Sequence, residues 1–194
     1  MEREYTLQEK YIKIREAVLG NPSANAVEIA MAVMREEYVN MHGPEHHFLD
    51  GAAFLAAYKN AGGEIGLESA LEELAKRTID MPGAMCGYWG ICGSVAAVGA
   101  ALSVIHRTGP LSTDRYYKEH MEYTASAIAV IAKPGGARCC KRNAFLSLTV
   151  GAEFVRKTYG IAMQTAAIGC PFSERNKQCL QERCPFHRRP EKDL

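Results

Sequence analysis

Cysteine is the residue type through which this chain can do the most chemistry. Its 194 residues include seven cysteines, and the first of them is residue 86. A thiolate binds metals and carries redox reactions, so cysteines that gather in loops indicate one of these roles. An odd number leaves at least one thiol unpaired in any intramolecular disulfide scheme. We therefore expect metal binding or redox chemistry from at least three of the seven, which are Cys86, Cys92, Cys139, Cys140, Cys170, Cys179 and Cys184.

The C-terminal cysteines have the pattern of metal ligands. Cys-Pro-Phe occurs twice, at Cys170 and Cys184, and Cys179 lies between the two copies. Proline directly after cysteine recurs at iron–sulfur ligands, and a 4Fe–4S cluster accepts a fourth thiolate from elsewhere in the chain. We therefore expect such a cluster. Zinc is the alternative metal, with His187 completing a set of three cysteines and one histidine, and free thiols in an irregular tail are a third interpretation.

A pair of adjacent cysteines offers that fourth thiolate. Cys139 and Cys140 follow two glycines at the start of an expected helix, and because neighbouring side chains diverge, we expect only one of the two to ligate the cluster. The sequence leaves open which one. A helix N-terminus with basic neighbours stabilises a thiolate and also binds phosphate or carboxylate groups. We therefore predict a cofactor-binding role for the three basic neighbours, Arg138, Lys141 and Arg142.

A glycine-rich loop carries the remaining two cysteines. Five residues separate Cys86 from Cys92, the only tryptophan of the chain lies between them, and a long apolar helix is expected after Cys92. The dipole of that helix should lower the pKa of the Cys92 thiol. We expect a reactive pair for electron or sulfur transfer, with metal ligation and simple packing as the alternatives. In a third hypothesis, a thiol enzyme, His47 acts as the base for Cys92.

Helices must position these thiols, because hydrophobic residues recur at spacings of three and four along almost the whole chain. Turn signals rich in glycine and proline separate the helical segments. The segment 92–106 is apolar on every side and rich in small residues, which is typical of a buried helix. We predict an all-α fold, a bundle of about six or seven helices around this central helix, with an irregular, metal-stapled C-terminal tail. The helical segments fall near residues 7–18, 25–38, 45–59, 67–74, 92–106, 113–131 and 138–159.

The composition changes near residue 169, which predicts two parts of the chain. Residues 170–194 hold three cysteines, three prolines and six basic residues but few aliphatic ones. Such a segment cannot bury a core of its own, and a bound metal can supply the missing stability. We therefore expect an α-helical domain at 1–168 and a cysteine-rich metal-binding tail at 169–194 that packs on it.

Charge and hydropathy narrow the setting of the protein. The 23 Lys and Arg residues against 22 Asp and Glu residues give a net charge of +1, which creates no field that would attract nucleic acid. No apolar stretch reaches the ~20 residues of a membrane span. The N-terminus lacks the apolar segment of a signal peptide. We therefore expect a cytoplasmic protein without membrane contact.

The partner that we expect is a redox or sulfur-transfer protein. The sequence leaves open whether the chain is itself a redox or sulfur-transfer enzyme and whether it forms a homodimer. The alternative function is a zinc-stapled binding module whose basic residues contact RNA or another anionic partner, although the near-zero net charge of the chain disfavours it.

Four motifs, in this order, resemble a known family. They are His46-His47-Phe-Leu, Met81-Pro-Gly-x-x-Cys-Gly-x-Trp-Gly-x-Cys-Gly, Gly-Gly-x-Arg-Cys-Cys-Lys-Arg and the two closing Cys-Pro-Phe segments. Over residues 40–187 they are similar to a cysteine-rich family known only as domain of unknown function 5714, common in methanogenic archaea and anaerobic bacteria. The resemblance implies no established activity. Its anaerobic setting implies that iron–sulfur chemistry is to be expected.

Overall fold

The structure, a computed structural model, describes residues 4–187. This part of the chain forms eight α-helices and one 3-10 helix, and it holds no strand beyond an isolated bridge between Cys170 and His187. None of these helices is both long and apolar enough to cross a membrane. The predicted all-α fold is confirmed. The α-helices are α1 (Leu7–Leu19), α2 (Ala26–Val33), α3 (Glu45–Asn60), α4 (Leu67–Thr78), α5 (Met85–Tyr88), α6 (Gly93–His106), α7 (Arg115–Ala132) and α8 (Cys140–Tyr159), and the 3-10 helix spans Gln181–Arg183.

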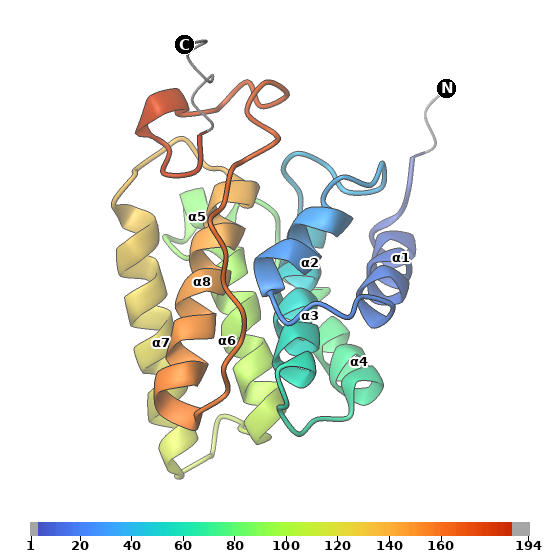
Figure 1. Ribbon diagram of the computed structural model, residues 1–194, viewed down its shortest axis with the longest axis vertical. Coiled ribbons are helices and arrows are strands. Elements are labelled where there is room, and N and C mark those ends of the chain that lie inside the picture. The colour runs from blue at the N-terminus through green and yellow to red at the C-terminus, as the bar shows by residue number, and fades with distance from the viewer. Residues whose placement is uncertain (1–3, 188–194) are drawn as a thin grey trace.

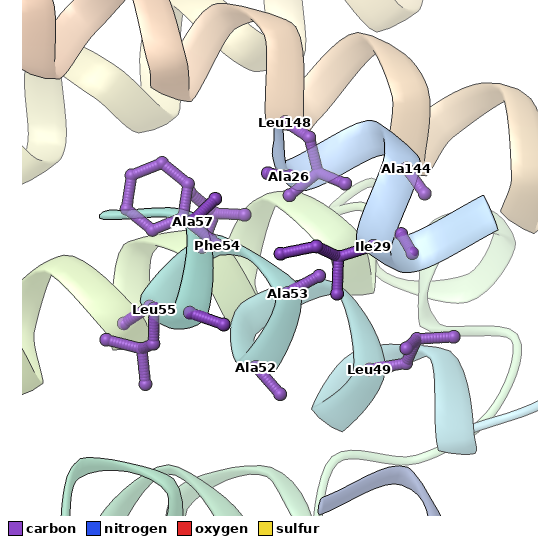
Figure 2. Packing of buried hydrophobic residues seen from close by; sticks show 14 of the residues in the cluster. Ala26, Ile29, Leu49, Ala52, Ala53, Phe54, Leu55, Ala57, Ala144 and Leu148 are labelled. Carbon is purple, nitrogen blue, oxygen red and sulfur yellow. The ribbon is translucent and has the colours of Figure 1, made fainter. Parts of the chain in front are cut away.

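Helix α3 is the most completely buried element of the bundle. Every residue from Glu45 to Tyr58 is buried, and α1, α2, α4, α6 and α8 all pack on it. Figure 2 shows Ile29 of α2 and Leu148 of α8 packed around the small side chains of α3. Helix α6, the predicted central helix, lies among α3, α4, α7 and α8. Because α3 begins with polar residues, the sequence pattern alone does not indicate that the whole helix is buried. Some of these polar residues line the site described below.

Side-chain caps fix where the helices begin. The Asn25 side chain accepts from backbone amides in the first turn of α2. Asp114 caps α7, and its carboxylate also matches the positive end of the helix dipole. Helix α2 ends at Val33, earlier than the predicted residue 38. The chain turns there and buries Tyr38 beneath Lys13 of α1, whose Nζ lies 5.4 Å from the ring centroid.

One end of the bundle collects the starts of three long helices. Helices α3, α6 and α8 all begin there, and the α5 loop and the C-terminal tail lie at the same end (Figure 1). After Tyr159, residues 160–169 run back along α8, and the Gln164 amide donates to the Ala24 carbonyl at 2.9 Å. This return places Cys170 near the start of α8. Cysteines distant in the sequence therefore meet at this end, which we call the cysteine end.

Candidate functional site

The seven cysteines are all free thiols, and they fall into two adjacent groups at the cysteine end. One group lines a cavity of about 310 Å³, which we call the thiol cavity. The second lines a smaller pocket under the tail, which we call the tail pocket. Cys139 borders both, so the two groups share a wall. The thiol cavity holds Cys86, Cys92 and Cys140, and the tail pocket holds Cys170, Cys179 and Cys184.

Phenylalanines attach the tail to the bundle. The Cys170 amide donates to the Phe186 carbonyl at 2.8 Å, so the two Cys-Pro-Phe segments lie side by side. Phe172 is buried, and the Phe186 ring packs edge-on against Phe145 of α8 with the centroids 5.4 Å apart. The tail thus gains its apolar burial from the helices beneath it, and this contact holds its cysteines over the start of α8.

The three tail cysteines share one local geometry. In each case the backbone N–H two residues further along the chain favours the thiolate, and at Cys179 it donates a hydrogen bond to the sulfur. Such N–H donors stabilise the thiolate over the thiol and tune the potential of a sulfur-bound cluster. The pairs are Phe172 to Cys170, Gln181 to Cys179 at 3.4 Å, and Phe186 to Cys184.

Cys139 completes this group from the helical domain. It is the N-cap residue of α8, and its sulfur accepts the Arg142 amide at 3.4 Å. It also accepts Asn176 Nδ2 of the tail at 3.5 Å. N–H groups therefore donate hydrogen bonds to Cys139 and Cys179, and backbone amides favour the thiolates of Cys170 and Cys184. Of the two adjacent cysteines, Cys139 borders the tail pocket whereas Cys140 does not.

The tail pocket is closed around its thiols. Burial raises the pKa of Cys170 and of Cys184, and the neighbouring sulfurs raise both further. The pocket has about 10 Å³ of free volume, less than one water needs. Among residues 4–187, no three His, Cys, Asp or Glu side chains are arranged to hold a single metal ion. The donor set suits a group whose metals each take one thiolate, and the tail must lift to admit it.

The thiol cavity lies between the starts of α3, α6 and α8 and the α5 loop. Cys92 accepts a hydrogen bond from Asn143 Nδ2 at 3.4 Å. Burial raises the pKa of Cys92 even though backbone amides of α6 favour its thiolate. The expectation that the helix dipole lowers this pKa is therefore wrong, because desolvation of the charged form outweighs the dipole. Burial likewise raises the pKa of Cys140 to about 12.

His47 lines the same cavity as the two loop cysteines. Its Nδ1 lies 3.3 Å from the Met81 carbonyl, which can only accept, so Nδ1 carries the proton and Nε2 holds a lone pair. The ring lies against Gly93, where an added Cβ would stand 2.1 Å from Nε2. Burial lowers the pKa of His47. Among the described residues no hydrogen bond joins His47 to Cys86 or Cys92. His47 therefore lines the same cavity as the two thiols but is not positioned to take a proton from either of them.

Sequence reasoning missed Asp50, one helical turn after His47. The Asp50 side chain lines the thiol cavity and is fully buried, and neither carboxylate oxygen has a hydrogen-bond partner among residues 4–187. Burial raises its pKa to about 8, although nearby Ser94 and Lys141 act in the opposite direction. A lone acidic residue within the small apolar residues of α3 is the sequence signal that could have found it.

The basic residues next to the cysteine pair have different surroundings. Lys141 is buried, and its Nζ donates to the Asn40 carbonyl at 2.7 Å and lies 3.0 Å from His46 Nε2. Burial lowers the pKa of Lys141 to about 8. The Arg142 guanidinium donates to two carbonyls of the loop before α8, at 3.1 and 2.8 Å. Arg138 alone of the three lines the thiol cavity, so it is the one placed to meet an anionic group there.

Comparison with known proteins gives one match. A family model described as a family of unknown function, DUF5714, matches residues 14–187. Neither the curated proteins nor the solved structures yield a match. The matched range spans both groups of cysteines and begins within α1. The chain belongs to this family, DUF5714.

Proposed function

We propose that the protein binds an iron–sulfur cluster through Cys139, Cys170, Cys179 and Cys184 and passes electrons or sulfur to a substrate or partner at the thiol cavity. The observation that carries the proposal is the tail pocket, which is lined by four thiols, two of which accept hydrogen bonds from N–H groups. Cysteine thiolates with N–H donors are the usual ligands of 4Fe–4S clusters.

The arrangement of the four sulfurs favours a cluster over a single ion. In a cluster each thiolate binds a different iron, so the four sulfurs need not converge on one point. Zinc requires four donors around one atom, and no three donors among residues 4–187 are arranged in this way. An anaerobic setting, which the family resemblance implies, would preserve such a cluster.

The shared wall of the two groups supports electron or sulfur transfer. Cys139 borders both the tail pocket and the cavity that holds Cys86 and Cys92. A cluster in the tail pocket would therefore stand directly beside the thiol cavity. The bound cluster supplies one-electron redox chemistry, and the cavity gives a substrate or a partner's reactive group a place next to it.

Zinc in the tail pocket is the second candidate, and His187 favours it. The Nδ1 atom of His187 is buried without a hydrogen-bond partner among the described residues, and the residue lines the tail pocket. Three cysteines and this histidine form a zinc donor set, and a single ion needs less opening of the tail than a cluster does. In this case the tail is a structural staple, and the protein is a binding module for RNA or another anionic partner.

Metal analysis of material purified without oxygen tests the proposal. We expect a brown protein with iron and acid-labile sulfide, and C179S should lose about four iron atoms per chain. The control is Ser173→Ala, because Ser173 lines the same pocket without supplying sulfur. A colourless protein with stoichiometric zinc would overturn the proposal in favour of the zinc module.

A further inference from the structure

Three of the seven cysteines are not among the four ligands proposed for the tail cluster. Cys86, Cys92 and Cys140 come from the α5 loop, the start of α6 and the start of α8, and all three line the thiol cavity. Asp50 and Asn143, whose Nδ2 donates to the Cys92 sulfur at 3.4 Å, line the same cavity. The odd cysteine count, which no disulfide scheme explains, divides into a set of four and a set of three.

Unpartnered polar atoms concentrate in the same cavity. Of the ten buried side-chain nitrogen and oxygen atoms without a hydrogen-bond partner among residues 4–187, six belong to residues that line the thiol cavity. A buried polar group without a partner is destabilising, and folded proteins contain few of them. The cavity is therefore built for a polar occupant. The six atoms are Nδ1 of His42, Nδ1 of His46, both carboxylate oxygens of Asp50, Oγ of Ser94 and Oδ1 of Asn143.

The size of the cavity limits what the occupant can be. Its volume of about 310 Å³ equals that of roughly ten water molecules. A single ion would leave most of this space unfilled, and no three donors in the described chain are arranged around one point. Three separated thiols around such a space match the corners of a polynuclear group.

We propose that the thiol cavity holds a second iron–sulfur cluster, bound by Cys86, Cys92 and Cys140, with the Asp50 carboxylate facing its fourth iron. Each thiol loses its proton as its sulfur binds iron. Carboxylates suit iron less than thiolates do, so the fourth iron is the position at which a substrate or sulfide exchanges. This inference uses cysteines other than those of the proposed function, and it stands even if the tail binds zinc.

Contacts join the two cluster sites. Cys139 and Cys140 are consecutive in the chain, one on each site. A hydrogen-bonded path runs from His42 on the cavity wall to Asn176 Oδ1 at 3.2 Å, and Asn176 Nδ2 reaches Cys139 at 3.5 Å. The cavity cluster would therefore react with substrate, and the tail cluster would exchange electrons with it across this short link.

Iron and sulfide counts on full-length variants, reconstituted anaerobically with ferrous iron and sulfide, test the second site. The wild type should bind about eight iron atoms per chain, and the triple variant C170S/C179S/C184S about four. In that triple background, C140S should remove the remaining iron, whereas the matched change one residue earlier, C139S, should leave it. Circular dichroism checks that each variant keeps its helices, and C86S, on the short α5, replaces C140S if the latter unfolds.

The outcomes separate this inference from the proposed function. A tail triple variant without iron, or C140S and C86S without effect on its iron content, would overturn the second cluster. If the tail triple variant binds as much iron as the wild type, that result would overturn the tail cluster instead. Asp50→Asn should keep the iron but change the electron paramagnetic resonance spectrum of the reduced cluster, and an unchanged spectrum would remove Asp50 from the fourth iron.

Discussion

The two ends of α6 use polar residues in opposite ways. Near its last turn, His106 Nδ1 lies 3.0 Å from His120 Nε2, and Thr108 Oγ1 contacts His120 Nδ1 at 3.2 Å and Ser103 Oγ at 2.9 Å. We call this group the histidine end. At the cysteine end, six buried polar side-chain atoms around the cavity lack hydrogen-bond partners among residues 4–187. The polar groups at the histidine end therefore bond to one another, whereas several at the cysteine end do not.

Loading with an iron–sulfur cluster should produce the largest of the expected effects, a slowing of amide hydrogen exchange at the cysteine end but not at the histidine end. In cluster-free protein the tail is held mainly by its phenylalanines, whereas ligated sulfurs tie it to α8. We expect anaerobic loading with iron and sulfide to slow amide hydrogen exchange in residues 170–187 by about 100-fold, or ~2.7 kcal/mol, with little change around His106. Mass-resolved exchange measures both, and equal slowing at the two ends would contradict the assignment.

The second-largest expected effect is the loss of stability when a methyl group is added at Gly93. An added Cβ there would stand 2.1 Å from His47 Nε2, so the imidazole must leave its place on the cavity wall. We expect Gly93→Ala to destabilise the protein by about 2–3 kcal/mol in chemical denaturation. Gly99→Ala on the same helix is the matched control, because its Cβ would meet only Thr124 Oγ1, at 3.4 Å. Equal losses in the two variants would show that the effect comes from the helix and not from the histidine.

Removal of one polar group from each end should have opposite effects on the metal-free protein. Asp50→Ala deletes a buried carboxylate without partners, so we expect stabilisation by about 2 kcal/mol. Thr108→Ala breaks two hydrogen bonds at the histidine end, so we expect a loss of about 1 kcal/mol. Urea denaturation measures both. A loss of stability in the Asp50 variant would mean that the carboxylate already has a partner in solution.

Acid should weaken the histidine end through His120, with the smallest effect of the four. Burial and the neighbouring His106 lower the pKa of His120 from 6.5 to about 4, although Glu119 and Asp114 oppose this shift. Between these pH values the unfolded chain binds a proton that the folded protein does not, so stability falls as the pH drops from 6.5 towards 4. We expect a loss of about 1 kcal/mol between pH 6.5 and about pH 5.5. His120→Asn should flatten the stability profile in this window, and a profile like that of the wild type would exclude His120 as the source.

The sequence was sufficient to predict the helices and the gathering of the cysteines. Residues with helical spacing and clear turn signals define all the long helices, because local patterns and burial agree there. The short α5 was not expected, since four residues around Cys86 carry no periodic signal. The choice between Cys139 and Cys140 depends on how α8 is rotated against the tail, and no local pattern encodes that rotation.

Asp50 and Cys92 show why the electrostatics of the site were harder to predict. A carboxylate in a helix normally faces solvent, so only the packing of α3 shows that Asp50 is buried. The dipole of α6 is a local property and was predicted, but the desolvation of Cys92 depends on the packing of α3 and α8 against α6, and both helices lie far away in the sequence. In both cases the deciding contribution came from distant segments.

The consecutive positions of Cys139 and Cys140 make the register of α8 a constraint on both proposed metal sites at once. Each residue of a helix turns it by about 100°. A one-residue deletion in the loop before α8 would therefore carry each thiol out of its own compartment and towards the other, while leaving the composition of the segment almost unchanged. Length variation in this family should accordingly be tolerated after the tail cysteines and between α6 and α7, but not between residues 133 and 139.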